Sequence, residues 1–351
     1  MKYRGIMFKI IRPILFAFSP EVAHNIVVKL LKFIAIIPFS DWIIKMFYGY
    51  KAPKLEKEIM GLTFPNPVGL AAGLDKNGEV FNQLGNMGFG FIEIGSITPA
   101  EQKGNPKPRC FRLVEDKAII NRMGINNKGV KYAVSKLKNR NPSLIVGANI
   151  IKSTSTPNEK APLDYEKSFA QLYDFVDYFV INVSCPNVKD ITKLQDITQL
   201  SQIIDRVSTL RRYYDEYRPI LLKVSPDLTY EQLDEIIDLM LISGIDGVVA
   251  TNTTTKREDL KTSSEKVESI GDGGLSGTPL FSRSKEMVKY ISYKTKGMLP
   301  IIAVGGIMTP KQAKEMLNSG ASLVQIYTGF IYNGPGFVKK ILKYLNHSLK
   351  S

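Results

Sequence analysis

The sequence predicts an α/β protein, a (β/α)8 TIM barrel with an N-terminal helical extension. From Leu55 onward, short apolar runs alternate with segments of helical periodicity, and eight of these runs have the length and composition of buried strands. Residues 1–50 differ in kind, because they consist largely of apolar stretches with helical spacing. We therefore expect residues 1–50 to form the extension and residues 51–351 to form the barrel.

The composition limits the classes of protein that fit. The chain has 351 residues and 44% hydrophobic content, which accommodates a barrel with an added segment and argues against global disorder. Its two cysteines, Cys110 and Cys185, cannot form a disulfide framework, which indicates a reducing compartment. The net charge of +14 suits an anionic lipid surface or an anionic small molecule. Nucleic acid has little support, because no long basic block or interleaved aromatic platform is present.

The extension contains a predicted helix that begins after Ser19 and ends at Pro38. In Ser19–Glu21, serine suits the N-cap, proline the first helical position and glutamate the positive end of the helix. The apolar segment before it, Ile6–Phe18, contains Pro13, which we expect to kink or divide that segment.

The helices of the extension either pack on the barrel or lie at a membrane surface with their apolar faces in the lipid. The run Ile26–Pro38 is too short to span a bilayer and is interrupted by Lys29 and Lys32. The region has neither a signal-peptide cleavage site nor the Arg/Ser bias of a transit peptide. The apolar and aromatic content of residues 36–48, which include Trp42, favours the membrane.

The barrel strands are predicted from apolar, β-rich runs bounded by turn residues. Thr229–Ser243 and Pro310–Ser319 are examples of the helical segments between them, and Leu55–Phe64 predicts a small hairpin that covers the barrel bottom. The eight predicted strands are Pro67–Ala71, Phe91–Gly95, Leu144–Ile150, Tyr178–Val183, Ile220–Val224, Gly247–Ala250, Ile301–Val304 and Leu323–Tyr327.

Each predicted strand contains or is followed by polar or glycine residues. The carboxyl ends of barrel strands meet at one face, where TIM barrels have their active sites. In chain order these residues are Ala72–Asn77, Ser96–Thr98, Asn149, Asn182–Asn187, Lys223, Thr251–Thr253, Gly305–Gly306 and Tyr327–Gly329. Cys185 alone would more commonly be a small buried residue. Beside seven other polar strand ends it becomes a candidate for chemistry.

The residue types at these ends favour a planar, anionic ligand that carries a phosphate. Gly277, Gly305–Gly306 and Tyr327–Gly329 fit the phosphate site that barrels form after strands seven and eight. Lys223 lies on a buried strand and needs an anionic partner, which is a reduced flavin, a phosphate or a structural carboxylate. A set of carboxamides can bind a flat ligand rich in N–H and C=O groups: Asn121, Asn126, Asn149, Asn182, Asn187 and Asn252.

Two other kinds of site have no support in the sequence. No G-x-G-x-x-G motif follows a predicted strand, so a Rossmann dinucleotide site is not indicated. The chain has only two histidines, His24 and His347, and no His-rich metal cluster.

Nine motifs, together with Arg112, carry a resemblance to a known family. They are Gly69–Lys76 (GLAAGLDK), Ile92–Ser96 (IEIGS), Gly104–Arg109 (GNPKPR), Ile120–Asn127 (INRMGINN), Asn182–Asn187 (NVSCPN), Ala250–Thr253 (ATNT), Gly273–Gly277 (GGLSG), Ala303–Gly306 (AVGG) and Gln325–Gly329 (QIYTG). Through them the chain resembles dihydroorotate dehydrogenase over nearly its whole length, in the membrane-associated, quinone-reducing class. Ser19–His24 (SPEVAH) resembles a helix start that only the quinone class carries.

The resemblance implies oxidation of dihydroorotate to orotate in pyrimidine biosynthesis, with FMN as cofactor and a membrane quinone as oxidant. It implies that Cys185 is the base for the C5 proton while a hydride leaves C6 for the flavin. The residues implied to contact FMN are Ala72, Gly73, Leu74, Asp75, Lys76, Ser96, Asn149, Asn182, Lys223, Thr251, Gly277, Gly306, Tyr327 and Thr328.

The same resemblance implies two further sites. Around the substrate it places Lys76, Asn121, Arg122, Met123, Gly124, Ile125, Asn182, Asn187, Asn252 and Thr253. It places His24 and Arg112 where the quinone head group meets the flavin, at the end of a tunnel under the two N-terminal helices.

Cys185 departs from the pattern of the quinone class, which normally has serine there, whereas cysteine is typical of the soluble classes. We give more weight to the extension, because the short soluble enzymes have no equivalent of residues 1–50. A thiol with a pKa of about 8.5 is also a more competent base near neutral pH than a hydroxyl. Two alternatives are the same reaction with fumarate or NAD⁺ as acceptor, and a flavin- or phosphate-binding barrel without turnover.

The location of the protein and two of its segments complete the expectations. The absence of a transit peptide and of a spanning helix favours the cytoplasmic face of a bacterial inner membrane, and the resemblance favours a monomer. Lys152–Pro162 and Lys256–Asp272 are expected to be mobile loops.

Overall fold

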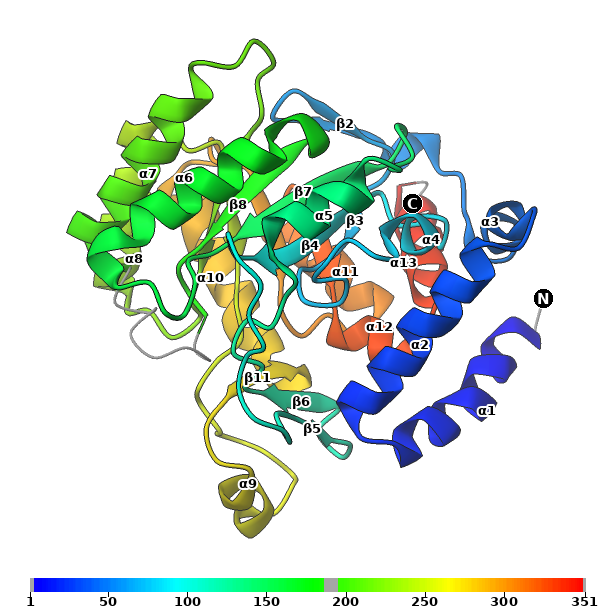
Figure 1. Cartoon of the computed structure of the whole chain (residues 1–351). Coiled ribbons are helices and arrows are strands. Elements are labelled where there is room, and N and C mark those ends of the chain that lie inside the picture. Colours follow the sequence, from blue (N-terminus) through cyan, green and yellow to red (C-terminus); the bar gives the residue numbers. More distant parts are fainter. Residues whose placement is uncertain (1–2, 186–194, 350–351) are drawn as a thin grey trace.

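Eight short, buried runs form parallel strands that close into a barrel (Figure 1). The computed structural model describes residues 3–185 and 195–349. The strands are β3 (Val68–Leu70), β4 (Phe91–Ile97), β7 (Ile145–Ile150), β8 (Tyr178–Asn182), β9 (Ile220–Val224), β10 (Gly247–Ala250), β12 (Ile301–Val304) and β13 (Leu323–Ile326). All eight predicted strands are confirmed, with ends that differ by at most a few residues, and so is the TIM-barrel fold class.

Closure of the barrel depends on pairing between the first and last strands. Gln325 of β13 lies beside Gly69 of β3, and the flanking pairs are Val324 with Val68 and Ile326 with Leu70. Around the ring the strand order is β10, β12, β13, β3, β4, β7, β8 and β9. The carboxyl ends of all eight strands therefore meet at one face.

The lower part of the barrel interior is filled by apolar side chains. Phe91 and Tyr178 pack there edge to face, with ring centroids 6.4 Å apart, and Phe64 contacts Phe91 from below. Glycines on the neighbouring strands make room for both rings. A Cβ at Gly69 would lie 2.3 Å from the Phe91 ring, and one at Gly147 would lie 2.1 Å from the Tyr178 ring.

The outer layer consists of helices that pack on the strands. Its helices are α4 (Phe81–Gly85), α5 (Gly129–Leu137), α6 (Ala161–Leu172), α7 (Ile197–Arg211), α8 (Tyr230–Ser243), α10 (Phe281–Lys294), α11 (Pro310–Asn318), α12 (Thr328–Asn333) and α13 (Phe337–Ser348). Helix α8 begins with a capping box, in which the Thr229 and Gln232 side chains bond each other's backbone N–H groups. The two barrel helices predicted from the sequence, α8 and α11, are confirmed.

Two further sheets flank the barrel. The predicted hairpin is confirmed as β1 (Lys57–Ile59) and β2 (Leu62–Phe64). The other sheet was not predicted: β5 (Cys110–Leu113), β6 (Ala118–Asn121) and β11 (Gly274–Gly277) pair antiparallel on the side of the barrel face. Its strands are short, and two of them carry polar residues of the proposed site, which masked the strand pattern.

The N-terminal extension forms α1 (Tyr3–Ala17), α2 (Pro20–Ala35) and α3 (Ser40–Tyr48). Ser19 occupies the N-cap position of α2 as predicted, but its side chain makes no capping hydrogen bond. The first segment was expected to be kinked or divided at Pro13, and it is not divided, because α1 is one continuous helix. Proline removes the hydrogen bond to the carbonyl of Lys9, and Lys9 is exposed, so water can bind that carbonyl.

Helix α2 is attached to the barrel domain by polar contacts near both ends. Glu21 forms an ion pair with Arg109 at 2.7 Å, and Lys32 forms one with Glu79 at 2.6 Å. Between them, Ala23 is buried against the domain. The extension is therefore docked on the domain, next to β5 (Figure 1).

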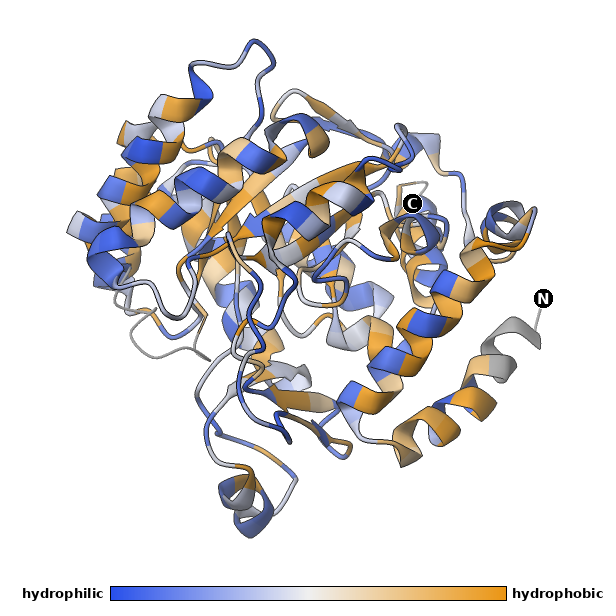
Figure 2. Cartoon of the chain, in the orientation of Figure 1, coloured by the Kyte–Doolittle hydropathy of each residue, from blue (hydrophilic) through white to orange (hydrophobic). Residues whose placement is uncertain are grey.

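The extension exposes many large apolar side chains. Figure 2 shows how many residues of these helices are hydrophobic. The exposed side chains include Ile10, Ile14, Phe18, Val22, Ile26, Leu30, Phe33, Ile36, Phe39, Trp42 and Met46. In the described part of the chain no single helix is long and apolar enough to cross a membrane. Helices α2 and α3 satisfy the criterion only as a pair, bent by 119°.

The two segments expected to be loops contain regular structure. Residues 264–270 form α9 (Ser264–Ile270), and Lys152–Pro162 contains the 3-10 turn Asn158–Lys160 and the start of α6. The prediction of a loop is therefore wrong for these residues. The α9 segment is held by Asp116 in the β5–β6 turn, which accepts hydrogen bonds from the backbone of Lys261 and Thr262.

The pKa of Glu79 gives a test of how α2 is held. Burial alone would raise this pKa, but hydrogen bonds from Lys32, Tyr132 and Lys128 outweigh it and lower the pKa from 4.5 to about 2. A folded-state pKa below the unfolded one contributes stability above pH 4.5 that is lost as the pH falls towards 2.

We therefore expect Glu79→Gln to lower the free energy of unfolding at neutral pH by about 1–2 kcal/mol, since both lysines are partly exposed. The difference from wild type should shrink as the pH falls below 4.5. Denaturant unfolding at a series of pH values measures it. A difference that stays constant down to about pH 3 would contradict this account.

Candidate active site

The upper part of the barrel interior is polar. Residues two apart along a strand face the same side, so the positions that follow the apolar layer also point inward. These positions hold Glu93 after Phe91, Asn149 after Gly147, Asn182 after Val180, Lys223 after Leu221 and Gln325 after Leu323. Five strands thus direct polar side chains into one space at the barrel mouth.

A continuous hydrogen-bond network joins four of these side chains. Glu93 accepts from Gln325 Nε2 at 2.6 Å and from Asn149 Nδ2 at 2.8 Å. Asn149 Oδ1 then accepts from Asn182 Nδ2 at 3.1 Å and from the Ser96 hydroxyl. Because Glu93 uses both oxygens as acceptors, Asn149 must direct its own oxygen towards Asn182.

The network continues to the end of β10. Asn252 Nδ2 donates to the Ser184 hydroxyl at 3.0 Å and lies 3.4 Å from Asn182 Oδ1. The backbone N–H of Thr253 donates to Asn252 Oδ1 at 2.8 Å. Asn149, Asn182 and Asn252, which were predicted as separate strand ends, therefore form one connected surface.

Lys223 is the buried cation of this surface. It is 6% exposed, and its ammonium makes no hydrogen bond or ion pair with a residue in the described part of the chain. The structural carboxylate considered from the sequence is thus absent among those residues. A buried ammonium without an acceptor is costly, so the position favours a ligand that supplies acceptor atoms or negative charge.

The loop after β3 brings a second lysine to the mouth. Lys76 Nζ donates to Asn126 Oδ1 at 2.5 Å. Burial, followed by the charge of Arg109, lowers the pKa of Lys76 to about 8. The Asp75 side chain has another task, because it accepts from the backbone N–H groups of Glu79 at 2.7 Å and Val80 at 2.8 Å and so holds the loop.

Burial raises the pKa of Asp75 to about 6. The Asp75 carboxylate accepts hydrogen bonds from the loop backbone, so it is not directed at a cofactor. The part of this loop that suits a cofactor is the backbone of Ala72, Gly73 and Leu74. The ring of Tyr327 lies against Gly73, 3.3 Å from where a Cβ would be.

The ends of β11, β12 and β13 form a cradle of backbone groups. Gly277 and Gly306 both have positive φ, 101° and 70°. A Cβ at Gly277 would lie 2.4 Å from the Lys117 carbonyl oxygen, and one at Gly306 would lie 2.5 Å from the Phe281 nitrogen. Only glycine fits this backbone, which exposes N–H groups in the manner of a phosphate site.

Two hydroxyls line the same region. Thr328 Oγ1 lies 2.9 Å from Ser276 Oγ, and Thr251 Oγ1 lies 2.9 Å from Ser284 Oγ. Both threonines were predicted at strand ends, and both are buried.

The predicted substrate loop follows β6. Ile125 has a φ of 56°, a rare conformation for a β-branched residue, and Gln102 Nε2 holds its carbonyl oxygen at 2.9 Å. Arg122 departs from the expectation for its side chain: the guanidinium donates to the carbonyls of Ile270 and Asp272 and stacks on Phe111 at 4.7 Å. Its side chain therefore fastens the α9 segment, and only its backbone lies in the loop.

The remaining predicted residues lie close to this loop or outside the described residues. Cys185 is partly buried at the end of β8, and Asn187 lies outside the part of the chain that the structure describes. Thr253 Oγ1 is buried and has no hydrogen-bond partner among the described residues, so it also invites a ligand.

His24 lies on α2 of the extension, and Arg112 lies on β5. Burial, together with the charge of Lys76, lowers the pKa of His24 to about 4, so its imidazole is neutral near pH 7. Arg112 donates to the carbonyl of Phe18 at 2.7 Å and stacks on the Phe16 ring at 4.4 Å. Phe16 also packs edge to face with Tyr332 at 5.3 Å. Arg112 and Tyr332 thus hold the C-terminal end of α1 against the barrel domain.

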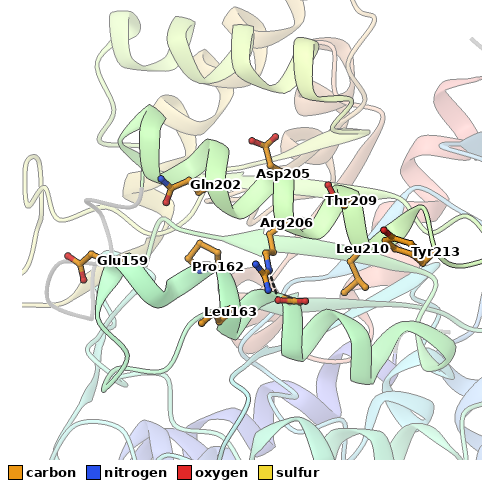
Figure 3. A pocket seen from close by; sticks show the side chains of 10 residues that line it. Glu159, Pro162, Leu163, Gln202, Asp205, Arg206, Thr209, Leu210 and Tyr213 are labelled. Carbon is orange, nitrogen blue, oxygen red and sulfur yellow. Dashed lines mark hydrogen bonds and ion pairs between the residues drawn. The ribbon is translucent and has the colours of Figure 1, made fainter.

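A surface groove lies elsewhere, between α6 and α7 (Figure 3). It encloses about 680 Å³, and the ion pair between Arg206 and Glu166, at 2.5 Å, crosses it. Its walls are helix side chains of the outer layer rather than strand ends, so it does not coincide with the polar network. In residues 3–185 and 195–349 no group of three or more His, Cys, Asp or Glu side chains is arranged to hold a metal ion.

Glu93 and Gln325 belong to two of the sequence motifs, but no role was predicted for them. Both are fully buried and hold the network together. The signal that could have found them is their position, because each is a polar residue two places after an inward-facing apolar residue on a buried strand.

Comparison with known proteins identifies the family. A family model described as "Dihydroorotate dehydrogenase" matches residues 54–349. The chain is similar to "Dihydroorotate dehydrogenase (quinone)" from Christiangramia forsetii, with 49% identity over 95% of this chain and 97% of the relative. It is also similar to the protein of that name from Coxiella burnetii, with 44% identity over 98% of each.

Solved structures agree with this. The DHODH from Eimeria tenella in complex with ferulenol is similar over 95% of this chain and 92% of that chain, with 35% identity and a TM-score of 0.84. The ligand-free DHODH from the same organism has 36% identity and a TM-score of 0.85. The chain therefore belongs to the dihydroorotate dehydrogenase family.

Proposed function

We propose that this protein oxidises dihydroorotate to orotate with FMN and passes the electrons to a membrane quinone. The observation that carries the proposal is the polar network of the barrel mouth, with Lys223 buried beside it and without a partner among the described residues. Family membership gives the reaction, and FMN is the cofactor of the family. Relatives that match nearly the whole chain are named for quinone as the acceptor, which supports the quinone class.

The residues present fit FMN. The backbone cradle at Gly277 and Gly306 and the hydroxyls of Thr251 and Thr328 suit a phosphate group, and Lys223 suits the electron-rich edge of a flavin. When bound there, FMN supplies a two-electron acceptor for the hydride from C6.

Substrate recognition falls to the carboxamides and Lys76. Dihydroorotate is flat, amide-rich and anionic, so Asn252, Asn182 and Asn121 can pair with its ring and Lys76 with its carboxylate. The backbone of Met123, Gly124 and Ile125 borders the same space. Asn187 and Thr253 complete the proposed set.

Cys185 is the proposed base. It lies at the end of β8, directly after Ser184, whose hydroxyl is engaged by Asn252. A thiolate at Cys185 takes the C5 proton of the substrate while the hydride leaves C6, so the substrate loses two electrons and two hydrogens in total.

We expect Cys185→Ala to slow flavin reduction by dihydroorotate by roughly 10²–10⁴, because the C5 proton then has no base. Reoxidation of reduced flavin by quinone should stay nearly unchanged. Anaerobic stopped-flow absorbance measures the two half-reactions separately. The matched control is Cys185→Ser, which restores the usual residue of the quinone class and should retain far more activity than alanine. If the flavin of the alanine variant is reduced at the wild-type rate, Cys185 is not the base.

Lys223 has a thermodynamic test. Reduction puts negative charge on the flavin, and a buried ammonium beside it stabilises that charge. We expect Lys223→Met to shift the flavin midpoint potential to more negative values by about 30 mV or more, the two-electron equivalent of a tenfold change. Spectroelectrochemical titration measures the shift. Lys223→Arg keeps the charge and serves as control, and an unchanged potential in the methionine variant would contradict the role.

At the membrane, residues 1–50 form the proposed quinone-side extension and residues 51–351 the catalytic barrel. The exposed apolar faces of α1, α2 and α3 enter the lipid interface, and the chain's net charge of +14 favours anionic headgroups. His24 and Arg112 then lie near the point where a quinone head group approaches from under these helices. We infer a monomer that is peripheral to the cytoplasmic face of a bacterial inner membrane.

Removing two exposed aromatic side chains tests this attachment. Phe39 and Trp42 are 80% and 63% exposed. The double variant Phe39→Ser, Trp42→Ser should weaken partition into anionic vesicles by at least about tenfold, because each ring loses its burial in lipid. Vesicle flotation measures it. The control is Tyr213→Ser, Tyr293→Ser, which removes side chains that are 80% and 79% exposed, one just after α7 and one on α10. Equal flotation of the two double variants would argue against the proposed face.

One purification separates the proposal from its alternatives. A yellow protein that bleaches on addition of dihydroorotate supports the oxidation, and a yellow protein that does not bleach supports a flavin-binding barrel without turnover. Steady-state rates with ubiquinone and menaquinone analogues, fumarate and NAD⁺ then identify the acceptor. We expect the quinones to be fastest.

A further inference from the structure

Helix α2 is joined to the barrel domain by an ion pair close to the proposed substrate loop. Arg109 Nη2 donates to Glu21 Oε1 at 2.7 Å, and Arg109 Nε donates to Glu21 Oε2 at 3.2 Å. The side chains are 7% and 15% exposed. Burial would raise the pKa of Glu21, but the hydrogen bond and charge of Arg109 outweigh it, and the pKa is lowered. The contact is thus a bidentate, largely buried pair of charges.

The same guanidinium holds the loop before β5. Arg109 Nη1 donates to the carbonyl oxygens of Lys103 at 2.7 Å and Asn105 at 2.9 Å. One edge of the Arg109 guanidinium therefore bonds α2, and another bonds this loop. A planar group with several fixed donors can do both at once, whereas an ammonium cannot.

The loop is in turn bonded to the substrate segment. The backbone N–H of Arg122 donates to the Arg109 carbonyl at 2.8 Å, and that of Asn105 donates to the Met123 carbonyl at 3.1 Å. Asn105 Nδ2 also donates to the Arg122 carbonyl at 2.9 Å. Gly104 packs so closely that a Cβ there would lie 2.2 Å from the Met123 oxygen. A shift of one segment must therefore move the other.

The chain of contacts ends at the substrate lysine. Asn126, at the end of the same segment, accepts the hydrogen bond from Lys76. Four contiguous links thus run from the first turn of α2 to the ammonium that is proposed to bind the substrate carboxylate. Each link is a hydrogen bond or a close backbone contact, so the path is physical rather than inferred from proximity.

We propose that Glu21 and Arg109 are positioning residues for dihydroorotate, which set the geometry of residues 121–126 and Lys76 according to how α2 is seated on the barrel. The proposal rests on the assignment of this segment to the substrate under the proposed function. It gives the extension a role in the first half-reaction, in addition to its proposed role on the quinone side. Because coupling is reciprocal, substrate at the loop must also stabilise the seated α2.

The test is Glu21→Gln in the full-length, FMN-loaded protein. This change keeps the shape of the side chain and removes its charge. We expect the apparent Kd for dihydroorotate in anaerobic flavin reduction to rise about tenfold, a coupling of ordinary size, while the limiting rate and quinone reoxidation stay within about twofold. Arg109→Lys should raise the Kd at least as much, because it also releases Lys103 and Asn105. The double variant should be no worse than Arg109→Lys, since both changes break one path.

Two controls separate positioning from general loosening. Arg140→Gln breaks an ion pair of similar burial, with Asp177 at 2.7 Å, at the opposite end of the barrel strands. Lys32→Gln loosens α2 at its other anchor, which has no contact with Arg109 or with residues 103–105. Both should lower the melting temperature and leave the Kd for dihydroorotate unchanged.

Hydrogen exchange supplies a second readout. Orotate should slow amide exchange in the first turn of α2 in the wild type and not in Glu21→Gln. The proposal is overturned if Glu21→Gln binds dihydroorotate as the wild type does, if Lys32→Gln raises the Kd equally, or if Glu21→Gln loses its FMN. Failure of the wild type itself to bleach with dihydroorotate would instead overturn the proposed function.

Discussion

Glu93 accepts hydrogen bonds from Asn149 on one side and Gln325 on the other, and the contact with Gln325 requires the closed barrel. Gln325 lies on the last strand and pairs with Gly69 of the first, and Glu93 lies on the strand beyond. A fully buried carboxylate is costly, and here its two amide donors offset that cost and are oriented by it. The direction of every amide above it follows from this contact.

The polar groups at the mouth are poorly suited to a protein that binds nothing there. Lys223 is buried without a partner among the described residues, Thr253 Oγ1 likewise, and Ile125 holds an unfavourable backbone conformation. Each feature reduces stability on its own. Natural sequences tend to keep such features where a ligand compensates them. The three together therefore argue for an occupied mouth more strongly than any motif does.

The barrel was predictable because buried parallel strands leave a simple signature, short apolar runs at regular intervals. The candidate site was predictable because a barrel brings distant strand ends together, as with Asn149, Asn182 and Asn252. The β5–β6–β11 sheet was not predictable, since its strands are short. The pairing of β6 with β11 also joins residues about 150 positions apart, such as Asn121 and Gly274. The continuity of α1 through Pro13 was also not predictable, because it depends on water binding the Lys9 carbonyl.

The side-chain contacts of Arg122 and Asp75 also could not be predicted from the sequence. Motifs placed both at the site, and the backbone agrees, but one side chain fastens α9 and the other caps its own loop. A motif states which residue stands at a position. Only the surrounding packing determines which atoms of that residue face the ligand.

The proposed cysteine base and the proposed membrane-facing extension are compatible. Cys185 lies at the end of β8, whereas His24 and Arg112 of the proposed quinone site lie on α2 and β5. Proton removal depends on the strand-end environment, and electron delivery depends on access to the flavin from under the helices. These two requirements are met by different segments of the chain. A thiol can therefore replace a hydroxyl at β8 without altering the route to the quinone, and the identity of the base carries little information about the acceptor.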